Sequence, residues 1–383
     1  MKILVLTHEF PPVGGGGGHV AQDLCEGLAD LGHELTVITA DLIGGVPEEL
    51  DGFPLPYKLI RVKTLRKDPA RASMPAMISF IISAVFRGLF LAWGWKPDII
   101  HVHFAVPSGP IAWFLSRLSG VPYVLTVHLG DVPGGTPAKT DRWFRFVKPF
   151  TYPIWRSASR VVAVSQYTRE LALKHYQVPI EVIHNGVDLG LYQRERMEVH
   201  DPPRIVFAGR FVPQKNPLLV IRTLASLKHL DWELLMMGDG ELYEKVKEEV
   251  HLNNLESRVI LPGWVSPETV KEEFLKSDIL FMPSLSEGLP VVGVQALASG
   301  LALVVSDIGG FADLVVDRTN GYRVDIDNHK MMENFQEALH SLIQDKELLT
   351  EYKSTSNSFS ENFSLKNICI AYEKVFTQTI GVK

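Results

Sequence analysis

The chain has 383 residues, more than the roughly 250–300 at which a single hydrophobic core stops growing, so two domains are expected. Hydrophobic residues make up 46% and charged residues 21% of the chain, which excludes wholesale disorder and low-complexity polymers. The formal net charge of −6 lacks the basic footprint of a dedicated nucleic-acid-binding protein. Two cysteines, Cys25 and Cys369, are too few for a disulfide framework or a zinc cluster, so we expect buried apolar fillers in a reducing compartment.

The first half of the chain alternates short strand patterns with helical ones. Residues 2–6 form a buried-strand run, a Pro- and Gly-rich loop follows, and apolar residues then recur at helical spacing before a strand at 35–39. Further strand candidates lie at 99–102, 123–127, 161–164 and 180–183, with room for helices between them. This alternation predicts an α/β domain with a doubly wound parallel sheet.

A second βα series begins at residue 204. Its predicted strands are 204–209, 233–237, 259–261, 279–282 and 303–306, and three helical stretches end the chain. The polar segment 194–203 separates the two series. We therefore predict the following parts: an N-terminal Rossmann-like domain over 1–195, a linker over 196–203, a C-terminal Rossmann-like domain over 204–362, and a C-terminal helix over 363–383 that is a candidate to pack back on the first domain.

Residues 58–95 combine basic and apolar side chains. The segment 75–95 is nearly continuously apolar, but Arg87 at its middle would cost roughly 3 kcal/mol in a bilayer, which favours a buried or membrane-facing helix over a span. Just before it, one acid, Asp68, stands among six bases: Lys58, Arg61, Lys63, Arg66, Lys67 and Arg71. The combination indicates peripheral contact with a membrane or an acidic acceptor, or else a solvated loop before a crossover helix. The apolar run at 3–6 is too short for an export signal, so we expect a cytoplasmic protein, with the inner face of the membrane as its point of contact.

Five glycines, Gly14 to Gly18, follow the first strand. Such bare backbone lets a phosphate or a sugar approach closely and presents amides at a helix N-terminus. A dinucleotide fingerprint would need glycine where His19 stands, which argues against a dehydrogenase. A flexible hairpin without a ligand is the alternative interpretation.

Two loops of the second half carry groups suited to a sugar nucleotide. Arg210 ends a strand and Lys215 follows in the same loop, so the pair can place two cations over a diphosphate. Residues 283–290 lie between a strand and an apolar helix, where amides suit phosphate oxygens and the carboxylate of Glu287 suits sugar hydroxyls.

Taken in order, these motifs resemble those of the retaining glycosyltransferases of family 4. The first half contributes His8-Glu-Phe-Pro-Pro-x-Gly-Gly, Leu28-x-x-Leu31-Gly-His33-x-Leu-Thr-Val-Ile-Thr39 and His184-Asn-Gly-Val-Asp188. The second half contributes Gly209-Arg210 with Lys215, Gly238-Asp-Gly240, Leu261-x-Gly263-x-Val265, and Pro283-Ser284 through Glu287-Gly-Leu-Pro290. The resemblance covers almost the whole chain and implies the GT-B architecture, in which two Rossmann-like domains face each other across a cleft.

The resemblance also implies an activity and a set of site residues. The protein would be a hexosyltransferase that moves a sugar from a UDP- or GDP-hexose to a hydroxyl of a sugar, polyol or lipid-linked acceptor, in glycolipid, cell-surface polysaccharide or small-glycoside synthesis. Arg210 and Lys215 would neutralise the leaving diphosphate, and Glu287 would hold hydroxyls of the donor sugar. His128, in Thr126-Val-His-Leu-Gly-Asp131, would lie beside the anomeric carbon, unless it is only a satisfied histidine at a strand end. The residues expected to frame the donor are Gly16, Gly17, Gly240, Val265, Gly288, Leu289, Pro290 and Gln295.

One position departs from the family pattern. The second acid expected seven residues after Glu287 is replaced by Gln295, a weaker hydrogen-bond acceptor, which predicts weaker nucleotide binding or an altered base preference. Because two cations and a helix N-terminus can stabilise the leaving group, we expect neither a metal ion nor another cofactor. Asp325-Ile-Asp327 is similar to a metal-binding D-x-D motif, but it lies late in the second domain and is interpreted as a strand-end acid pair.

Two other functions fit the same scaffold. A sugar-nucleotide epimerase or a glycan phosphorylase would share the phosphate-binding features, although the segment 287–290 favours a transferase. A non-enzymatic alternative is a protein that binds a sugar nucleotide without catalysis, and Gln295 is the only residue that favours it.

Overall fold

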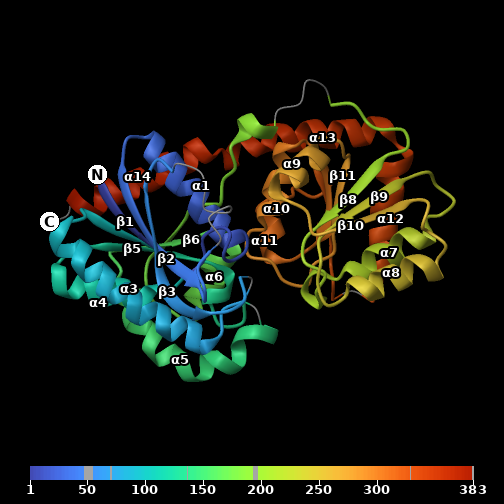
Figure 1. Cartoon of the computed structure of the whole chain (residues 1–383). Coiled ribbons are helices and arrows are strands. Elements are labelled where there is room, and N and C mark those ends of the chain that lie inside the picture. The colour runs from blue at the N-terminus through green and yellow to red at the C-terminus, as the bar shows by residue number, and fades with distance from the viewer. Residues whose placement is uncertain (47–54, 70, 136, 193–196, 328, 382–383) are drawn as a thin grey trace. The chain divides into compact units, whose positions relative to one another are not determined.

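The computed structural model of the chain forms two compact α/β units, each built around its own sheet (Figure 1). The first unit comprises Met1–Gly186 together with Leu365–Lys383, and the second comprises Val187–Ser364. The structure describes residues 1–46, 55–69, 71–135, 137–192, 197–327 and 329–381, and over 137–146 it describes the backbone alone. The chain thus passes from one unit to the other twice.

A seven-stranded parallel sheet is the centre of the first unit. Its strand order is β3-β2-β1-β4-β5-β6-β7, and every neighbouring pair is parallel. The strands are β1 (Lys2–Leu6), β2 (Glu34–Leu42), β3 (Lys58–Arg66), β4 (Ile99–His103), β5 (Tyr123–Val127), β6 (Arg160–Ala163) and β7 (Ile180–Val182). The side chains of β1 from Ile3 to Leu6 are all fully buried, because helices cover both faces of this sheet, and such strands are continuously apolar instead of alternating.

Helices cover the two faces of this sheet in two layers. On one face α1 (Gly16–Asp30) packs against α14 (Leu365–Gly381), the C-terminal helix. The opposite face is covered by α3 (Met74–Gly94), α4 (Ser108–Ser119), α5 (Pro137–Ser157) and α6 (Gln166–Leu173) (Figure 1). The two cysteines, Cys25 on α1 and Cys369 on α14, are buried free thiols in the first of these layers.

The second unit repeats the pattern with a six-stranded sheet. Its order is β10-β9-β8-β11-β12-β13, again with parallel neighbours. The strands are β8 (Arg204–Ala208), β9 (Glu233–Met237), β10 (Val259–Gly263), β11 (Ile279–Met282), β12 (Ala302–Ser306) and β13 (Gly321–Val324). The helices are α7 (Pro217–Ser226), α8 (Tyr243–Leu252), α9 (Pro267–Leu275), α10 (Val291–Ala298), α11 (Gly309–Ala312), α12 (Met331–Gln344) and α13 (Lys346–Phe359). Single 3₁₀ turns are η1 (Leu129–Asp131) in the first unit and η2 (Leu189–Tyr192), η3 (Pro213–Lys215) and η4 (Ser360–Phe363) in the second.

Both sheets reverse their strand order beside their first strand. The switch point lies between β1 and β4 in the first sheet and between β8 and β11 in the second. Open parallel sheets bind ligands outside the carboxyl ends of their strands at such points. The loops that follow these four strands are therefore where a ligand is expected to bind.

The strand β3 corrects the interpretation of residues 58–71 as a basic loop. Basic and apolar residues are interspersed along β3, and burial alternates from Val62 to Arg66 as in an edge strand, with Arg66 inside and Leu65 outside. Arg66 is almost fully buried and donates hydrogen bonds to three main-chain carbonyls, including that of His8 at 3.0 Å. Arg61 donates to the carbonyl of Pro11 at 2.6 Å. Two of the six bases therefore hold the loop after β1 in place instead of forming a charged surface.

The unit boundary also differs from the predicted one. The predicted boundary after residue 195 lies outside the described residues, and the two units divide earlier, between Gly186 and Val187. Residues 197–203, predicted as part of a linker, belong to the second unit, where a ring nitrogen of His200 lies 3.1 Å from the carboxylate of Asp278. The polarity of this segment reflects contact with a buried carboxylate. Helix α14, by contrast, belongs to the first unit, where it packs on α1.

Candidate active site

The two loops at the switch point of the second sheet are tied together by hydrogen bonds. The loop after β8 contains Gln214, whose carbonyl accepts a hydrogen bond of 2.8 Å from the amide of Leu285 in the loop after β11. The side-chain amide of Gln214 in turn donates to the carbonyl of Ser286, also at 2.8 Å. Gln214 was not expected from the sequence. It positions the loop with the predicted cations against the loop with the predicted carboxylate.

Three predicted residues, Arg210, Lys215 and Glu287, are on these two loops. The Nζ atom of Lys215 forms a close ion pair with the carboxylate of Glu287, and the two side chains are only 17% and 8% exposed. Arg210 is exposed on the same loop as Lys215, and its guanidinium has no partner within the described part of the chain. The structure thus places two cations and one anion on adjoining loops, with a net charge of +1.

The loop after β9 lies directly on the loop that carries Arg210. Gly238 has a φ of +140°, and a Cβ atom on it would come within 1.9 Å of the Gly209 carbonyl oxygen. At Gly240, with a φ of +154°, a Cβ atom would come within 2.6 Å of the Phe211 carbonyl oxygen. Both positions require glycine because two backbones touch there. The structure therefore gives Gly240, predicted to bind the donor, a packing role in shaping the Arg210 loop.

The other predicted donor-binding residues lie near the carboxyl ends of β10 and β11. Val265 is half-buried just after β10, and the neighbouring Trp264 is 74% exposed, an aromatic surface that the motif pattern did not single out. Leu289 and Pro290 are buried, and Pro290 is the N-cap of α10. A Cβ atom on Gly310 would lie 2.1 Å from the Gly288 carbonyl oxygen, so the short helix α11 packs closely against this loop.

Gln295 lies in the second turn of α10, on the partly exposed side of the helix. It shares this side with Val291 and Val292, whereas the intervening residues Gly293 and Val294 are buried. The helix begins directly after Pro290, so its first amides face the loop that carries Glu287. Gln295 and Glu287 thus belong to one continuous loop-and-helix element.

In the first unit, the glycine loop and His128 come together around Phe104. A Cβ atom on Gly17 would lie 2.6 Å from the Cζ atom of Phe104 and 3.8 Å from the Cε1 atom of His128. The rings of Phe104 and His128 stack with their centroids 4.4 Å apart. Gly16 is exposed at the start of α1, and the N-cap amide of Gly15 donates to the carboxylate of Glu9 at 3.1 Å. Three separate loops therefore converge at the switch point of the first sheet.

The ring of His128 lies beside the turn that follows β5. The amide of Asp131 donates a hydrogen bond of 2.9 Å to the main-chain carbonyl of His128, and the Nε2 atom of the ring has no hydrogen-bond partner among the described residues. Burial lowers the pKa of His128 to about 4, which keeps the ring neutral at pH 7. The Nε2 atom of the neutral ring is therefore available for a hydrogen bond with a hydroxyl of a ligand.

Asp131 holds this arrangement in place. Its carboxylate accepts hydrogen bonds from the amides of His128 at 2.9 Å and Val106 at 3.3 Å. Burial raises the pKa of Asp131 to about 7, against the lowering effect of these backbone hydrogen bonds. Asp131 thus joins the loop after β5 to the loop after β4.

Sequence reasoning overlooked the histidines of β4. His101 and His103 alternate along the strand, so both point to one face of the sheet, and their ring centroids are 4.4 Å apart. His101 Nε2 lies 2.9 Å from the hydroxyl of Thr126, which lies 3.1 Å from the hydroxyl of Tyr372 on α14. The H-x-H pattern inside an apolar strand was the available signal. This chain of contacts connects the C-terminal helix to the strands behind His128.

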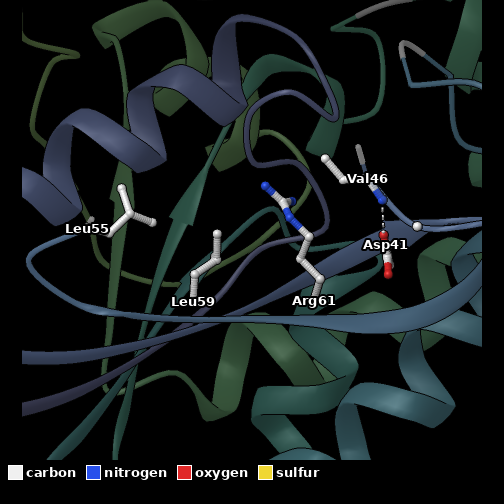
Figure 2. Close-up of a pocket in the computed structure, with 6 residues that line it drawn as sticks. Asp41, Val46, Leu55, Leu59 and Arg61 are labelled. Atoms are coloured by element: carbon white, nitrogen blue, oxygen red, sulfur yellow. Dashed lines mark hydrogen bonds between the residues drawn. The ribbon is translucent and has the colours of Figure 1, made fainter. Parts of the chain in front are cut away.

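A separate pocket of about 340 Å³ lies at the edge of the first sheet (Figure 2). It is lined by Asp41, Gly45, Val46, Leu55, Leu59 and Arg61. Asp41 accepts a hydrogen bond from the amide of Val46 at 3.0 Å, and Arg61 reaches the loop after β1 through Pro11. The pocket therefore adjoins the loop that leads to the five glycines.

Histidine, cysteine and carboxylate side chains in the described part of the chain do not form a group placed to bind a metal ion. Among those residues, no group of three or more His, Cys, Asp or Glu is placed to hold a metal ion. Asp325 follows β13 directly, and its carboxylate accepts a hydrogen bond of 2.9 Å from the amide of Asp327. The D-x-D pattern is thus a local turn at a strand end.

Two family models match the chain in succession. "Glycosyltransferase Family 4" matches residues 14–191, and "Glycosyl transferases group 1" matches residues 192–359. Together they span residues 14–359, which include the five glycines, His128, Arg210, Lys215 and Glu287.

Individual proteins show the same similarity. The chain is 28% identical over 381 residues to an uncharacterised glycosyltransferase of Methanocaldococcus jannaschii, which spans 99% of this chain and 98% of that protein. It is 29% identical over 292 residues to the UDP-Gal:alpha-D-GlcNAc-diphosphoundecaprenol alpha-1,3-galactosyltransferase of Escherichia coli, with coverage of 70% and 72%. The structure of Anabaena HepE in complex with UDP and glucose superposes with a TM-score of 0.76 at 17% identity, covering 99% of this chain and 100% of that one. This structural similarity shows that the chain has the GT-B fold, which consists of two Rossmann-like domains.

Proposed function

Because the chain belongs to family 4 of the glycosyltransferases and is a hexosyltransferase with the GT-B fold, we propose that it transfers a hexose from a UDP- or GDP-hexose to an acceptor hydroxyl with retention of anomeric configuration. The observation that carries the proposal is the placement of Arg210, Lys215 and Glu287 on two joined loops at the switch point of the second sheet. Such a point is where open parallel sheets bind phosphorylated ligands.

The reaction demands stabilisation of negative charge on the leaving group. The bond between the anomeric carbon and the diphosphate oxygen breaks, and the electron pair departs with the diphosphate. Arg210 and Lys215, with the first amides of α10, supply the compensating positive charge at fixed positions. The acceptor hydroxyl oxygen forms the new bond on the same face of the sugar, and its proton passes to the departing diphosphate. We therefore propose that no metal ion is needed for this step.

The ion pair of Lys215 and Glu287 prepares the site for both parts of the donor. In the absence of a donor, each side chain neutralises the other where both are largely shielded from water. A diphosphate draws Lys215 toward its oxygens, and the carboxylate of Glu287 then accepts hydrogen bonds from hydroxyls of the donor sugar. One contact thereby links recognition of the phosphate to recognition of the sugar.

The neutral ring of His128 and its Nε2 atom, which has no partner among the described residues, indicate a role for this side chain. We assign Nε2 to a hydrogen bond with a sugar hydroxyl next to the anomeric carbon. Gly17 and Phe104 fix the position of the ring, because Gly17 lies against Phe104 and Phe104 stacks on His128.

The acceptor belongs to glycoconjugate synthesis. The Escherichia coli relative is named for transfer from UDP-Gal to an alpha-D-GlcNAc-diphosphoundecaprenol, which supports a lipid-linked or growing polysaccharide acceptor for this chain as well. Nucleotide sugars are used in the cytoplasm, so we place the enzyme there, with its acceptor at the inner face of the membrane.

The proposal is tested by measuring release of nucleoside diphosphate from UDP-, GDP- and ADP-hexoses in the presence of a chelator. We expect one donor to be hydrolysed slowly, and the rate to fall by about 10²–10³ in Lys215→Met, the range seen when one group that stabilises the transition state is lost. Lys276→Met is the matched control, since Lys276 also pairs with a glutamate but lies just before β11, at the opposite end of the sheet.

Three outcomes contradict the proposal in different ways. A rate that depends on added divalent metal contradicts the metal-free step, and equal rates in the two lysine variants contradict the assigned donor site. Interconversion of the donor sugar without release of diphosphate, or release that requires inorganic phosphate, identifies an epimerase or a phosphorylase instead.

A further inference from the structure

Helix α3 exposes an unbroken row of large apolar side chains. The row consists of Met74, Ile78, Ile82, Phe86, Phe90 and Trp93, each 46–71% exposed. Residues four apart in a helix form a ridge along its surface, so the row is one continuous strip over the whole length of α3. At about 200 Å² for each side chain, its exposed area is on the order of 600 Å², the upper end of what soluble monomers present.

The opposite side of α3 carries mostly small residues. The buried residues are Ala76, Phe80, Ala84, Gly88, Leu91 and Ala92. A Cβ atom on Gly88 would come within 2.5 Å of Leu115 on α4, so small residues are required there for close packing. A helix that only covers a core places its large apolar residues inward. α3 places Phe80 and Leu91 inward, but the six large residues of the exposed row remain outside the core and are available to a partner.

Helix α3 does not span a membrane. By length and composition α3 is the single helix in the described ranges that passes as a membrane span, with a mean hydropathy of 1.9. However, it connects β3 and β4, which belong to one parallel sheet, and its buried row is part of the core under that sheet. A spanning α3 would therefore require the first unit to come apart. The helix lies along a surface.

The charge around the row identifies that surface as anionic. From Pro69 to Gly130 the sequence contains one acid, Asp98, but four bases: Arg71, Arg87, Lys96 and Arg117. Arg71 precedes the N-cap of α3 and Lys96 follows its end, and both are exposed. Arg117 is exposed on α4, the helix packed beside α3, which also exposes Phe114 and Leu118 (Figure 1). Cations at both ends of an apolar strip match a layer of acyl chains beneath anionic headgroups.

We propose that the exposed row of α3 docks on an anionic lipid bilayer, with the helix lying in the plane of the headgroup boundary and its two flanking bases in contact with lipid phosphates. The occupant is the lipid surface and not a second copy of the chain, because two copies would bring their four bases together with Asp98 as the one acid between Pro69 and Gly130 to offset them. The inference does not rest on the proposed function, since the row and its flanking charges are independent of the donor site.

The test is sedimentation of the full chain with vesicles of phosphatidylglycerol and phosphatidylcholine, compared with vesicles of phosphatidylcholine alone. We expect binding to the mixed vesicles, weakened by salt, and a loss of about tenfold in the partition coefficient for each of Phe86→Ser and Phe90→Ser. Leu252→Ser is the matched control, because Leu252 at the end of α8 has the same 68% exposure as Phe90 but lies in the second unit. Both phenylalanines are exposed, so circular dichroism should show unchanged folding.

Each other result overturns the proposal. Equal binding of Phe90→Ser and Leu252→Ser places the contact elsewhere, and binding that ignores anionic lipid removes the role of the bases. A doubled mass in light scattering that Phe90→Ser abolishes identifies a second copy as the occupant. Release of nucleoside diphosphate from the donor in solution, measured in parallel, should be the same in Phe90→Ser and the wild type, so failure of this inference is distinguishable from failure of the proposed function.

Discussion

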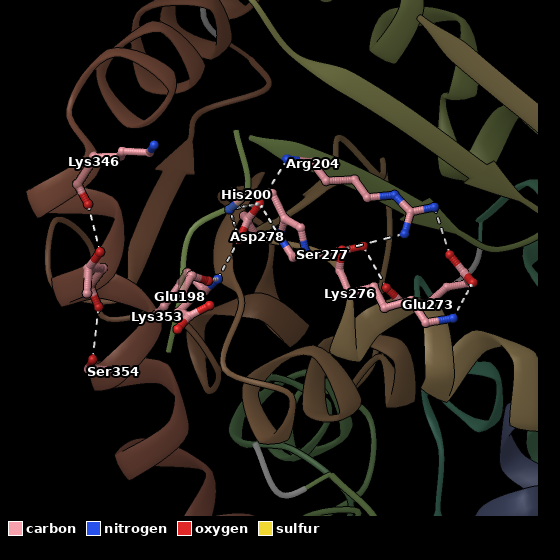
Figure 3. A network of polar contacts seen from close by, with 11 residues as sticks. Glu198, His200, Arg204, Glu273, Lys276, Ser277, Asp278, Lys346, Lys353 and Ser354 are labelled. Carbon is pink, nitrogen blue, oxygen red and sulfur yellow. Dashed lines mark hydrogen bonds and ion pairs between the residues drawn. The ribbon is translucent and has the colours of Figure 1, made fainter. Parts of the chain in front are cut away.

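Two lysines on α13 provide a quantitative test of how the second unit is held together. Lys353 is fully buried and pairs with the fully buried carboxylate of Asp278, which also contacts the ring of His200 and accepts a hydrogen bond of 2.9 Å from the amide of Arg204 (Figure 3). Lys346, two turns earlier on the same helix, pairs with Asp201 at 3.1 Å, but these two side chains are 54% and 83% exposed. The helix thus offers a buried pair and an exposed pair of the same kind.

The free energy of unfolding should fall by different amounts when each of the two ion pairs is removed. In Lys353→Met the carboxylate of Asp278 keeps its hydrogen bonds but loses its only buried cation among the described residues, which should lower the free energy of unfolding by about 3–5 kcal/mol. In Lys346→Met water solvates both partners already, so the loss should stay below about 0.5 kcal/mol. Methionine keeps the length and apolar stem of lysine, so the comparison isolates the charge.

Native-state hydrogen exchange of peptides from β8 and β11 reports unfolding of the second unit by itself, which avoids fitting a two-unit protein to one transition. We expect the exchange free energy of these strands to fall in Lys353→Met and to stay unchanged in Lys346→Met. A loss below 1 kcal/mol in Lys353→Met, or similar losses in both variants, would refute the reasoning that the buried pair anchors residues 197–204 to the sheet.

Three further predictions concern the candidate site. Burial raises the pKa of Asp131 from 3.8 to about 7, so its contribution to stability is complete below about pH 4 and is lost as the pH rises through 7. Between pH 5 and pH 8 the free energy of unfolding of the wild type should therefore fall by about 3 kcal/mol more than that of Asp131→Asn. Parallel pH profiles of the two proteins would contradict this. Gly17→Ala should displace the ring of Phe104 and lower kcat/KM by about tenfold or more, whereas Gly15→Ala, whose Cβ atom meets nothing within 4 Å, should leave it unchanged. Gln295→Glu should tighten the dissociation constant of the donor by about tenfold, measured by calorimetry, because a carboxylate accepts stronger hydrogen bonds than an amide, and an unchanged constant would exclude Gln295 from the ribose contact.

Local sequence pattern predicts the fold and the two cations of the candidate site. Strands buried on both faces are short continuous apolar runs, and the loops at their carboxyl ends follow at fixed offsets along the chain. Arg210, Lys215 and Glu287 could therefore be assigned to the ends of β8 and β11 before any three-dimensional information. The family resemblance added their expected roles, and the two family models confirm the membership.

The edge strand β3 shows where local pattern was insufficient. An alternation of basic and apolar residues describes a solvated loop as well as an edge strand, and only pairing with β2 distinguishes them. Arg66 was counted as surface charge because its partners, main-chain carbonyls such as that of His8, are supplied by a loop far away in sequence. A hydrogen bond from a side chain to a main-chain carbonyl far away in sequence leaves no trace in composition.

The sequence by itself determined the two βα series, the loops that carry charge, and the presence of an apolar helix near residue 80. Tertiary structure decided which loops meet: Gly17, Phe104 and His128 follow three different strands and converge only because β1, β4 and β5 are neighbours in the sheet. It also decided which side of α3 faces outward. Both rows of that helix are apolar at the same spacing, so hydrophobicity cannot rank them, and the close approach of α4 selects the row with small residues for the interior.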